Sequence, residues 1–285
     1  MDKHKLLQTY ARNLSNSRNR DHYLRMAGRF LDGCKGSGRL HIERYIESLR
    51  ERYKPGTVNL HFRVIRRLYA VNGLEWEFTR GEAPVIKELD EYRPQLSPDI
   101  IEQMAYRAKT GKLYPEHQTF IALSTIYGLR REEMANIRAK DVNLRKSSIY
   151  ISTLKSGRER YHLIPKEIKP IIAAHNFDQV FPLGSLSVMF KRIIVHSGYR
   201  DLKKVRLGWH TVRRSLVTGL VDNGCPLVAL KAFVRWRSGE GEMAMPSRYY
   251  GNVMITAKDN EPVLQTARGD EEIFEKYHPF LQFWR

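Results

Sequence analysis

Two short stretches bring an arginine together with a second polar side chain at helical spacing. In GWHTVRRSLVTGL (208–220), His210 lies three residues before Arg213, and in TIYGLRREEMANIR (125–138), Arg130 lies three residues before Glu133. Side chains at these separations share one face of a helix. A carboxylate so placed can hold a guanidinium in a fixed orientation, and two guanidinium groups can together bind one phosphate. Each pair taken alone is equally typical of a structural or surface ion pair.

A basic hairpin is the next candidate. The runs 148–153 and 159–164 have the composition of β-strands, and Ser156-Gly157 provides a turn between them. Lys155 lies just before that turn and Arg158 just after it. A lysine on a turn is usually a solvated charge, but a basic hairpin also has a shape that fits a DNA groove.

Two adjacent tyrosines near the end of the chain could supply a nucleophile. They are Tyr249 and Tyr250 in RYYGNV (248–253). A tyrosine hydroxyl, with a pKa of about 10, becomes nucleophilic only where cations and a base favour the phenolate. Tyrosine is also an ordinary packing residue, and this chain has 15 of them.

The charge of the chain favours a polyanionic partner. Lys and Arg number 49 against 31 Asp and Glu, a net charge of +18. Residues 1–80 hold 17 Lys and Arg against eight Asp and Glu, about half of the excess, so the charge is not confined to one basic tail. The two cysteines provide neither a disulfide framework nor a cysteine-rich zinc site. The absence of a long apolar run predicts no membrane span, and the N-terminal sequence does not resemble a signal peptide. We expect an intracellular, cytoplasmic protein.

Hydrophobic spacing predicts a mostly α fold with a small β-hairpin or sheet, in two domains. Residues 1–80 contain four stretches with apolar residues at three- and four-residue spacing, which predicts a helical bundle. The segment 81–96 is rich in proline and acidic residues and predicts a linker. Ser97 followed by Pro98 predicts the start of a helix, so the second domain covers 97–285. Its last stretch, 269–285, predicts a terminal helix that packs on its own domain or docks on a neighbouring subunit.

Taken in order, these elements resemble the tyrosine recombinase (phage integrase) superfamily, including integrases of viral or archaeal type. The family pattern runs Arg, Lys, His-x-x-Arg, His or Trp, then Tyr. GLRREE resembles the first-arginine motif, TLKSGRERYHLIP the hairpin with the lysine, HTVRR the His-x-x-Arg motif, FVRWRSG the His or Trp segment, and SRYYGNV the nucleophile segment. The matching residues are Arg130, Lys155, His210, Arg213, Trp236 and Tyr249, with Tyr250 as the alternative nucleophile.

The sequence departs from the family pattern in two places. VRW (234–236) stands where the family has Leu-Gly-His, and the glycine-containing segment RSGEGEMAMPSR (237–248) before Tyr249 is longer than usual.

The resemblance implies a helical core-binding domain and a catalytic domain that together clamp double-stranded DNA at an attachment or recombination site. Tyr249 would attack the scissile phosphate and form a 3′-phosphotyrosine, while Lys155 protonates the leaving 5′ oxygen. Arg130 and Arg213 would clamp the phosphate, and His210 would assist proton transfer. Trp236 would donate its indole N–H or pack against the site. Neither metal nor ATP is implied.

The resemblance also concerns the protein's assembly on DNA. It implies self-association, as a tetramer on DNA. Candidate DNA-binding residues are Arg63, Arg66, Arg67 and Arg158.

Three alternatives remain open from the sequence. The first is a type IB topoisomerase or telomere resolvase with related chemistry. The second is a DNA-binding protein without catalysis, and the third is a metal-dependent nuclease or transposase.

Overall fold

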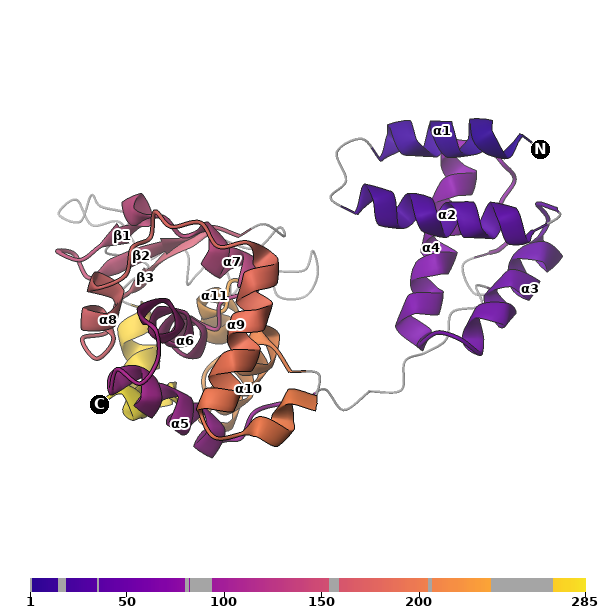
Figure 1. Cartoon of the computed structure of the whole chain (residues 1–285). Coiled ribbons are helices and arrows are strands. Elements are labelled where there is room, and N and C mark those ends of the chain that lie inside the picture. The colour runs from indigo at the N-terminus through magenta and orange to yellow at the C-terminus, as the bar shows by residue number, and fades with distance from the viewer. Residues whose placement is uncertain are drawn as a thin grey trace, which may run out of the picture. The chain divides into compact units, whose positions relative to one another are not determined.

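The chain forms two compact units, Met1–Tyr92 (unit 1) and Arg93–Arg285 (unit 2). The structure is a computed structural model, and it describes residues 2–14, 19–34, 36–79, 82, 94–153, 159–204, 207–236 and 269–285. Figure 1 shows helices in both units and β-strands in the second. A mostly helical fold with one small sheet was predicted from the sequence, and it is confirmed.

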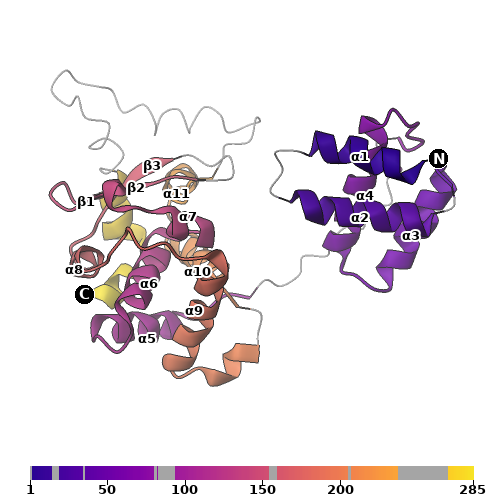
Figure 2. The same ribbon diagram turned by 45° about the horizontal axis from the view of Figure 1, so that its top comes forward.

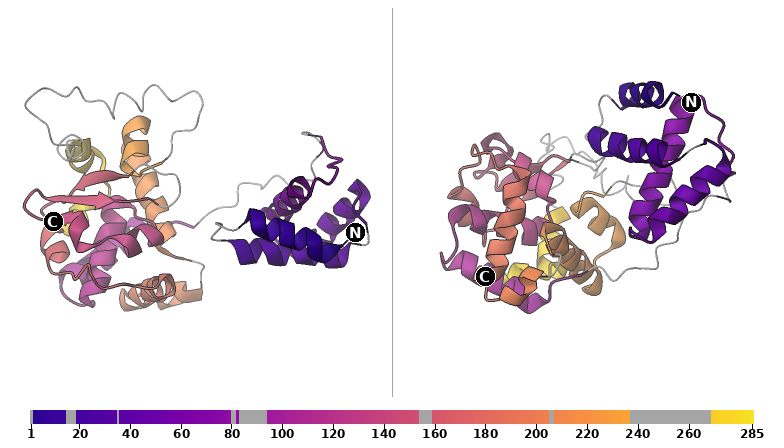
Figure 3. Two further views of the ribbon diagram at one scale, coloured as in Figure 1. Left: turned by 90° about the horizontal axis from the view of Figure 1, so that it is seen from above. Right: turned by 45° about the vertical axis from the view of Figure 1, so that its right-hand side comes forward.

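Unit 1 is a bundle of the four predicted helices. They are α1 (Lys3–Asn13), α2 (Arg20–Gly33), α3 (Arg39–Arg50) and α4 (Pro55–Val71) (Figure 3). Helix α4 contacts the other three because one side of it is apolar: Val58, Ile65 and Leu68 are fully buried there. Arg63 and Arg66 lie between these positions and are exposed. The unit therefore has an apolar centre and a basic surface on α4.

Unit 2 is built around one buried helix, α6 (Pro115–Tyr127). Every described residue of α6 from Thr119 to Tyr127 is buried, which fits a helix that is apolar on all sides. Helices α5, α7, α8 and α10 all contact it, and Figure 1 shows it in the interior of the unit. The surrounding helices are α5 (Pro98–Lys109), α7 (Arg131–Asn136), α8 (Lys169–Ala173), α9 (Leu183–His196), α10 (Trp209–Asp222) and α11 (Leu227–Phe233), with 3₁₀ turns at Ala139–Asp141 and Arg200–Lys204.

A three-stranded antiparallel sheet covers one side of unit 2 (Figure 2). Strands β2 (Ser148–Ile151) and β3 (Arg160–Leu163) pair in the register Ser148↔Leu163, and they lie within the two predicted strand runs. Strand β1 (Val142–Asn143) pairs with the other edge of β2. It was not predicted, because two residues are too few to show an alternating pattern.

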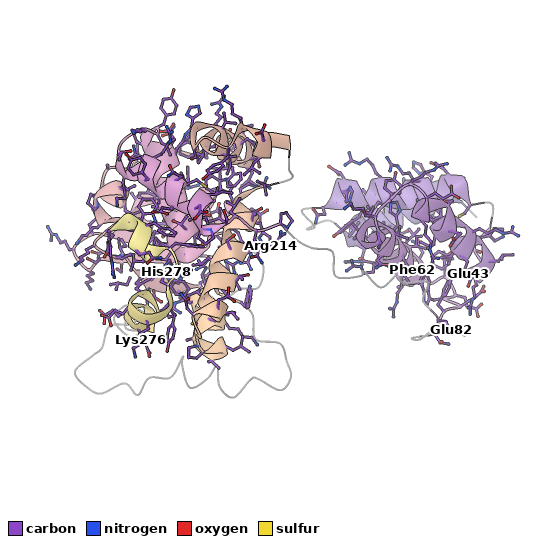
Figure 4. All side chains as sticks on the ribbon, turned by 90° about the horizontal axis from the view of Figure 1, so that it is seen from below. Glu43, Phe62, Glu82, Arg214, Lys276 and His278 are labelled. Carbon is purple, nitrogen blue, oxygen red and sulfur yellow. The ribbon has the colours of Figure 1, made fainter. Side chains whose placement is uncertain are left out.

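The C-terminal segment packs on its own unit. It begins in a helical turn at Gly269, continues as a π-helical turn, Ile273–Tyr277, and ends in a 3₁₀ turn, Leu281–Trp284. Trp284 is buried and its indole nitrogen donates to Thr125 Oγ1 on α6. His278 Nε2 hydrogen-bonds the Ile126 carbonyl, and Figure 4 labels His278 in this segment. In the described part of the chain, no helix is long and apolar enough to cross a membrane.

Candidate active site

A tight chain reversal places Arg130 at the start of α7. Gly128 follows α6 with φ +57°, a left-handed conformation that favours glycine. A Cβ at this position would lie 3.0 Å from Leu216 Cδ2 and 3.4 Å from Arg213 Cγ, both on α10. Glycine therefore lets the chain turn sharply while α10 packs closely against it, and the turn brings Arg130 next to Arg213.

Glu133 fixes the guanidinium of Arg130, as the i and i+3 spacing predicted. Arg130 Nη1 donates to Glu133 Oε1 over 2.6 Å, and the backbone N–H of Arg130 donates to Glu133 Oε2 over 2.8 Å. The Glu133 side chain is 2% exposed, whereas that of Arg130 is 26% exposed. Arg130 is therefore held from the inside of the unit and open to solvent on its outer side.

Arg213 lies deeper than Arg130. It is 2% exposed, and its guanidinium donates to the carbonyls of Gly128 and Val234. Burial, together with the nearby Arg235 and Arg130, lowers the pKa of Arg213 to about 9, although Glu133 acts in the opposite direction. Burial therefore makes the charge of Arg213 less favourable, and its carbonyl acceptors and Glu133 offset part of that cost.

A pocket of about 370 Å³ adjoins Arg130. His210, at the start of α10, is exposed and lines the same pocket. Its other lining residues include Arg131 and Lys191, so the pocket is rich in cations; the full set is Arg130, Arg131, Glu132, Ser187, Lys191, Leu207, Gly208, Trp209 and His210. Arg213 is not among them, so His210 and Arg213 differ in exposure although they share one helix.

Arg235 is a buried charge that the sequence reasoning missed. It is 0% exposed, and its Nη2 donates to Glu133 Oε2 over 3.1 Å. Glu133 is therefore shared between Arg130 and Arg235. Burial would raise the pKa of Glu133, but Arg235, the N–H of Arg130 and the charges of Arg213 and Arg130 together hold it below its usual value.

A second buried acid continues this network towards the C-terminal segment. Asp270 accepts from Arg160 Nη2 over 2.8 Å and from the backbone N–H of Leu163 over 3.0 Å, and it lies 2.9 Å from His162 Nδ1. His162 Nε2 lies 3.0 Å from Arg235 Nη1. The four guanidinium groups, Arg130, Arg160, Arg213 and Arg235, thus outnumber the two carboxylates, Glu133 and Asp270. The cluster has excess positive charge, and Arg130 is the member of the cluster that lines the pocket.

Residues 94–177 match the family model "Phage integrase family". This part of unit 2 contains both Arg130 and Glu133. This segment of the chain is therefore similar to the phage integrase family. No curated protein sequence matches the chain.

Solved structures of integrases and of a site-specific recombinase share the fold. The integrase of transposon Tn1549 in complex with circular intermediate DNA has a TM-score of 0.62 at 17% identity, over 89% of this chain and 96% of that one. XerH site-specific recombinase bound to palindromic difH substrate, a post-cleavage complex, has a TM-score of 0.62 at 14% identity, over 77% and 73% of the two chains. A lambda integrase dimer bound to a COC′ core site has a TM-score of 0.59 at 14% identity, over 86% and 76%. At these identities the likeness shows the fold.

Of the six residues that the tyrosine recombinase pattern selects, the structure describes four. Arg130, His210 and Arg213 lie around the turn at Gly128 and its pocket. Trp236 is half-buried and packs against the apolar core of unit 2 at the end of α11. Lys155 and Tyr249, like Tyr250 and Arg158, lie outside the described residues.

The remaining arginines of the predicted motifs have separate contacts. Arg131 Nη1 donates to Ser187 Oγ on α9, and Arg214 Nη1 donates to the Pro94 carbonyl; Figure 4 labels Arg214 on α10. In unit 1, Arg67 donates twice to Asn13 Oδ1. No group of three or more His, Cys, Asp or Glu residues that could hold a metal ion occurs among the residues that the structure describes.

Proposed function

We propose that this protein is a site-specific DNA recombinase, or integrase, that cuts and rejoins DNA strands through a 3′-phosphotyrosine intermediate. The observation that carries the proposal is Arg130. Its guanidinium is fixed by Glu133 and lines a cationic pocket that His210 also lines. Arg130 and Glu133 both lie within the segment that matches the phage integrase family.

The arginines stabilise the phosphate as it reacts. More negative charge collects on the nonbridging oxygens in the transition state, and one preorganised donor there contributes about 3 to 4 kcal/mol. Arg130 provides such donors from the wall of the pocket. A guanidinium has five N–H donors, and Arg213 has donors beyond those bound to Gly128 and Val234.

The remaining roles are those that the family pattern implies. Tyr249 attacks phosphorus, and the phosphodiester is exchanged for a phosphotyrosine bond as the 5′ oxygen leaves with a proton from Lys155. His210, in the pocket, assists proton transfer or holds the phosphate, and Trp236 supports the site by packing. A DNA 5′ hydroxyl then attacks the phosphotyrosine and reseals a strand, so the bond energy is conserved without ATP or metal.

We also propose where and with what the protein acts. Residues 1–80 form the core-binding domain and 97–285 the catalytic domain, joined by the linker 81–96. The two bind double-stranded DNA inside the cell, with Arg63, Arg66, Arg67 and Arg158 on the phosphate backbone.

The chain assembles as a tetramer on two duplexes. Light scattering of the trapped protein–DNA complex measures this stoichiometry, and a one-to-one complex at saturation would contradict it.

Covalent trapping tests the chemistry. The probe is a pool of short duplexes with a randomised core and one nick, labelled at the 5′ end of the strand upstream of the nick. We expect an SDS-resistant labelled protein band in the presence of a chelator, lost in Tyr249→Phe and kept in Tyr250→Phe. Loss only in Tyr250→Phe would keep the mechanism and move the nucleophile by one residue.

Other outcomes of the same experiment favour the alternatives. Salt-sensitive DNA binding without any covalent band would favour a noncatalytic DNA-binding protein. Relaxation of supercoiled plasmid without site dependence would favour a type IB topoisomerase, and activity abolished by the chelator would favour a metal-dependent nuclease.

A further inference from the structure

Arg235 occupies a backbone position that usually belongs to glycine. It follows α11 with φ +59°. Its N–H donates to the Ala232 carbonyl, and the N–H of Trp236 donates to the Lys231 carbonyl, a pattern that ends helices with a left-handed residue. Arginine is strained in this conformation. Something other than the backbone must therefore favour an arginine here.

The guanidinium of Arg235 joins four elements of unit 2. Nη2 donates to the Tyr127 carbonyl at the end of α6 and to Glu133 on α7, and Nη1 donates to the Phe233 carbonyl on α11 and to His162 on β3. All of these bonds are 3.0 to 3.2 Å long. A charge with no exposed surface is stable only with such partners.

The bond to His162 fixes the state of that ring. Arginine can only donate, so His162 Nε2 accepts, and the proton of the neutral ring is on Nδ1, which donates to Asp270. Asp270 lies at the start of the C-terminal segment. One chain of hydrogen bonds therefore runs from Asp270 through His162, Arg235 and Glu133 to Arg130.

We propose that Arg235 is a positioning residue for strand cleavage. Its guanidinium binds Glu133 on the buried side, so that Glu133 holds Arg130 in the orientation that binds a phosphate in the pocket. Through His162 and Asp270, Arg235 also connects Glu133 to the C-terminal segment. The inference rests on the proposed function, and it assigns a role in cleavage to a residue outside the six of the family pattern.

Replacing Arg235 by glycine removes the guanidinium and at the same time removes the unfavourable backbone conformation, so the contribution of the guanidinium can be measured alone. In Arg235→Gly the left-handed conformation becomes favourable, so any loss comes from the missing side chain. At saturating protein, we expect covalent trapping of the nicked duplexes to slow by about a hundredfold, the scale expected when a group is misplaced by about 1 Å. The Kd for the same DNA changes by less than about threefold, because Arg235 does not reach the surface.

A chemical rescue distinguishes positioning from a general structural role. Arg235→Gly leaves a buried space lined by the former acceptors of the guanidinium. Methylguanidinium at millimolar, non-denaturing concentration is expected to restore the trapping rate, whereas urea at the same concentration is not. Ser147→Gly is the matched control, since Ser147 also has a positive φ, +47°, but lies in the turn between β1 and β2. It should trap at the wild-type rate.

A second variant covers the case in which Arg235→Gly does not fold. Arg235→Lys keeps the buried charge but loses the planar fork, and we expect trapping about tenfold slower than wild type with an unchanged Kd. An unchanged rate in either variant would overturn the inference, as would parallel losses of rate and affinity without rescue. Failure of the wild-type protein to trap any duplex would instead overturn the proposed function, and the inference with it.

Discussion

The arginines of α4 in unit 1 and those around Glu133 in unit 2 have opposite surroundings. Arg63, Arg66 and Arg67 are exposed, whereas Arg213 and Arg235 are 2% and 0% exposed. An exposed arginine adapts to a DNA backbone and contributes affinity that salt weakens. A buried one is held by its partners before any ligand arrives, which is what stabilisation of a transition state requires. The two sets should therefore be separable by experiment.

Arg130→Ala gives the largest expected effect. Because Arg130 is the fixed donor that opens into the pocket, the rate of covalent trapping should fall by about a thousandfold. DNA affinity should change only a few-fold. Arg138→Ala is the control, since Arg138 lies at the other end of α7 and donates to the carbonyls of Ala135 and Ile137. If both variants lost the same amount of activity, the special role of Arg130 would be wrong.

Acid should destabilise unit 2 more than unit 1. Burial lowers the pKa of His162 and of His278 to about 4 from 6.5. Between these values the unfolded chain binds more protons than the folded one, so stability falls as the pH falls. From pH 7 to pH 5 each histidine removes about 2 kcal/mol.

The buried carboxyl groups do not enter this pH window. The ordinary pKa values of Asp270 and Glu133 are 3.8 and 4.5, and both are lowered in the folded unit, so their stabilisation is lost only at lower pH. Hydrogen exchange followed by mass spectrometry measures each unit separately. Unit 1 has the buried His61, whose pKa burial also lowers, but less than for His162 and His278, so a smaller loss is expected there. Equal losses in both units would contradict the prediction.

Replacing the α4 arginines should change binding and leave chemistry intact. In the triple variant Arg63→Gln, Arg66→Gln, Arg67→Gln, the slope of log K against log salt should become less steep by about 0.9 for each lost phosphate contact. The trapping rate at saturating protein should stay at the wild-type value. Arg50→Gln, which removes an exposed arginine paired with Glu47 on α3, serves as the control. A slower chemical step in the triple variant would break the proposed division between the units.

Arg131→Gln and Arg214→Gln should have the smallest effects. Arg131 reaches Ser187 and Arg214 reaches the Pro94 carbonyl, so neither holds Glu133 in the way that Arg130 and Arg235 do. We expect binding or stability to weaken by about 1 kcal/mol or less, measured by titration and thermal unfolding. Trapping at saturation should continue, and its complete loss in either variant would show that the residue acts in cleavage.

The sequence predicted the elements whose patterns are local. The four helices of unit 1 and the strands β2 and β3 follow from spacing over a few residues. The pairing of Arg130 with Glu133 was also predictable, because three residues separate the partners. The Ser97-Pro98 helix start is confirmed as well, although the Ser97 side chain makes no capping hydrogen bond.

The buried network was not predictable, because its members are far apart in the sequence. His162 and Asp270 are separated by 108 residues, and Arg235 and Glu133 by 102. One signal was present: VRW replaces the Leu-Gly-His of the family, so an arginine stands where a glycine is usual. The burial of the Arg213 side chain was also not predicted. The spacing of residues shows which face of a helix they share, but it does not show which other elements pack on that face.

The left-handed Arg235 also has a consequence for how such sequences diverge. A change from glycine to arginine at this position adds a buried charge. The protein tolerates that charge only where an acid and a hydrogen-bond acceptor are already in place to bind the guanidinium. Once His162 has come to depend on that arginine, a return to glycine leaves His162 Nε2 without this donor, whereas Asp270 keeps Arg160 and the N–H of Leu163. Relatives with arginine at this position should therefore keep the histidine and the acid that bind it.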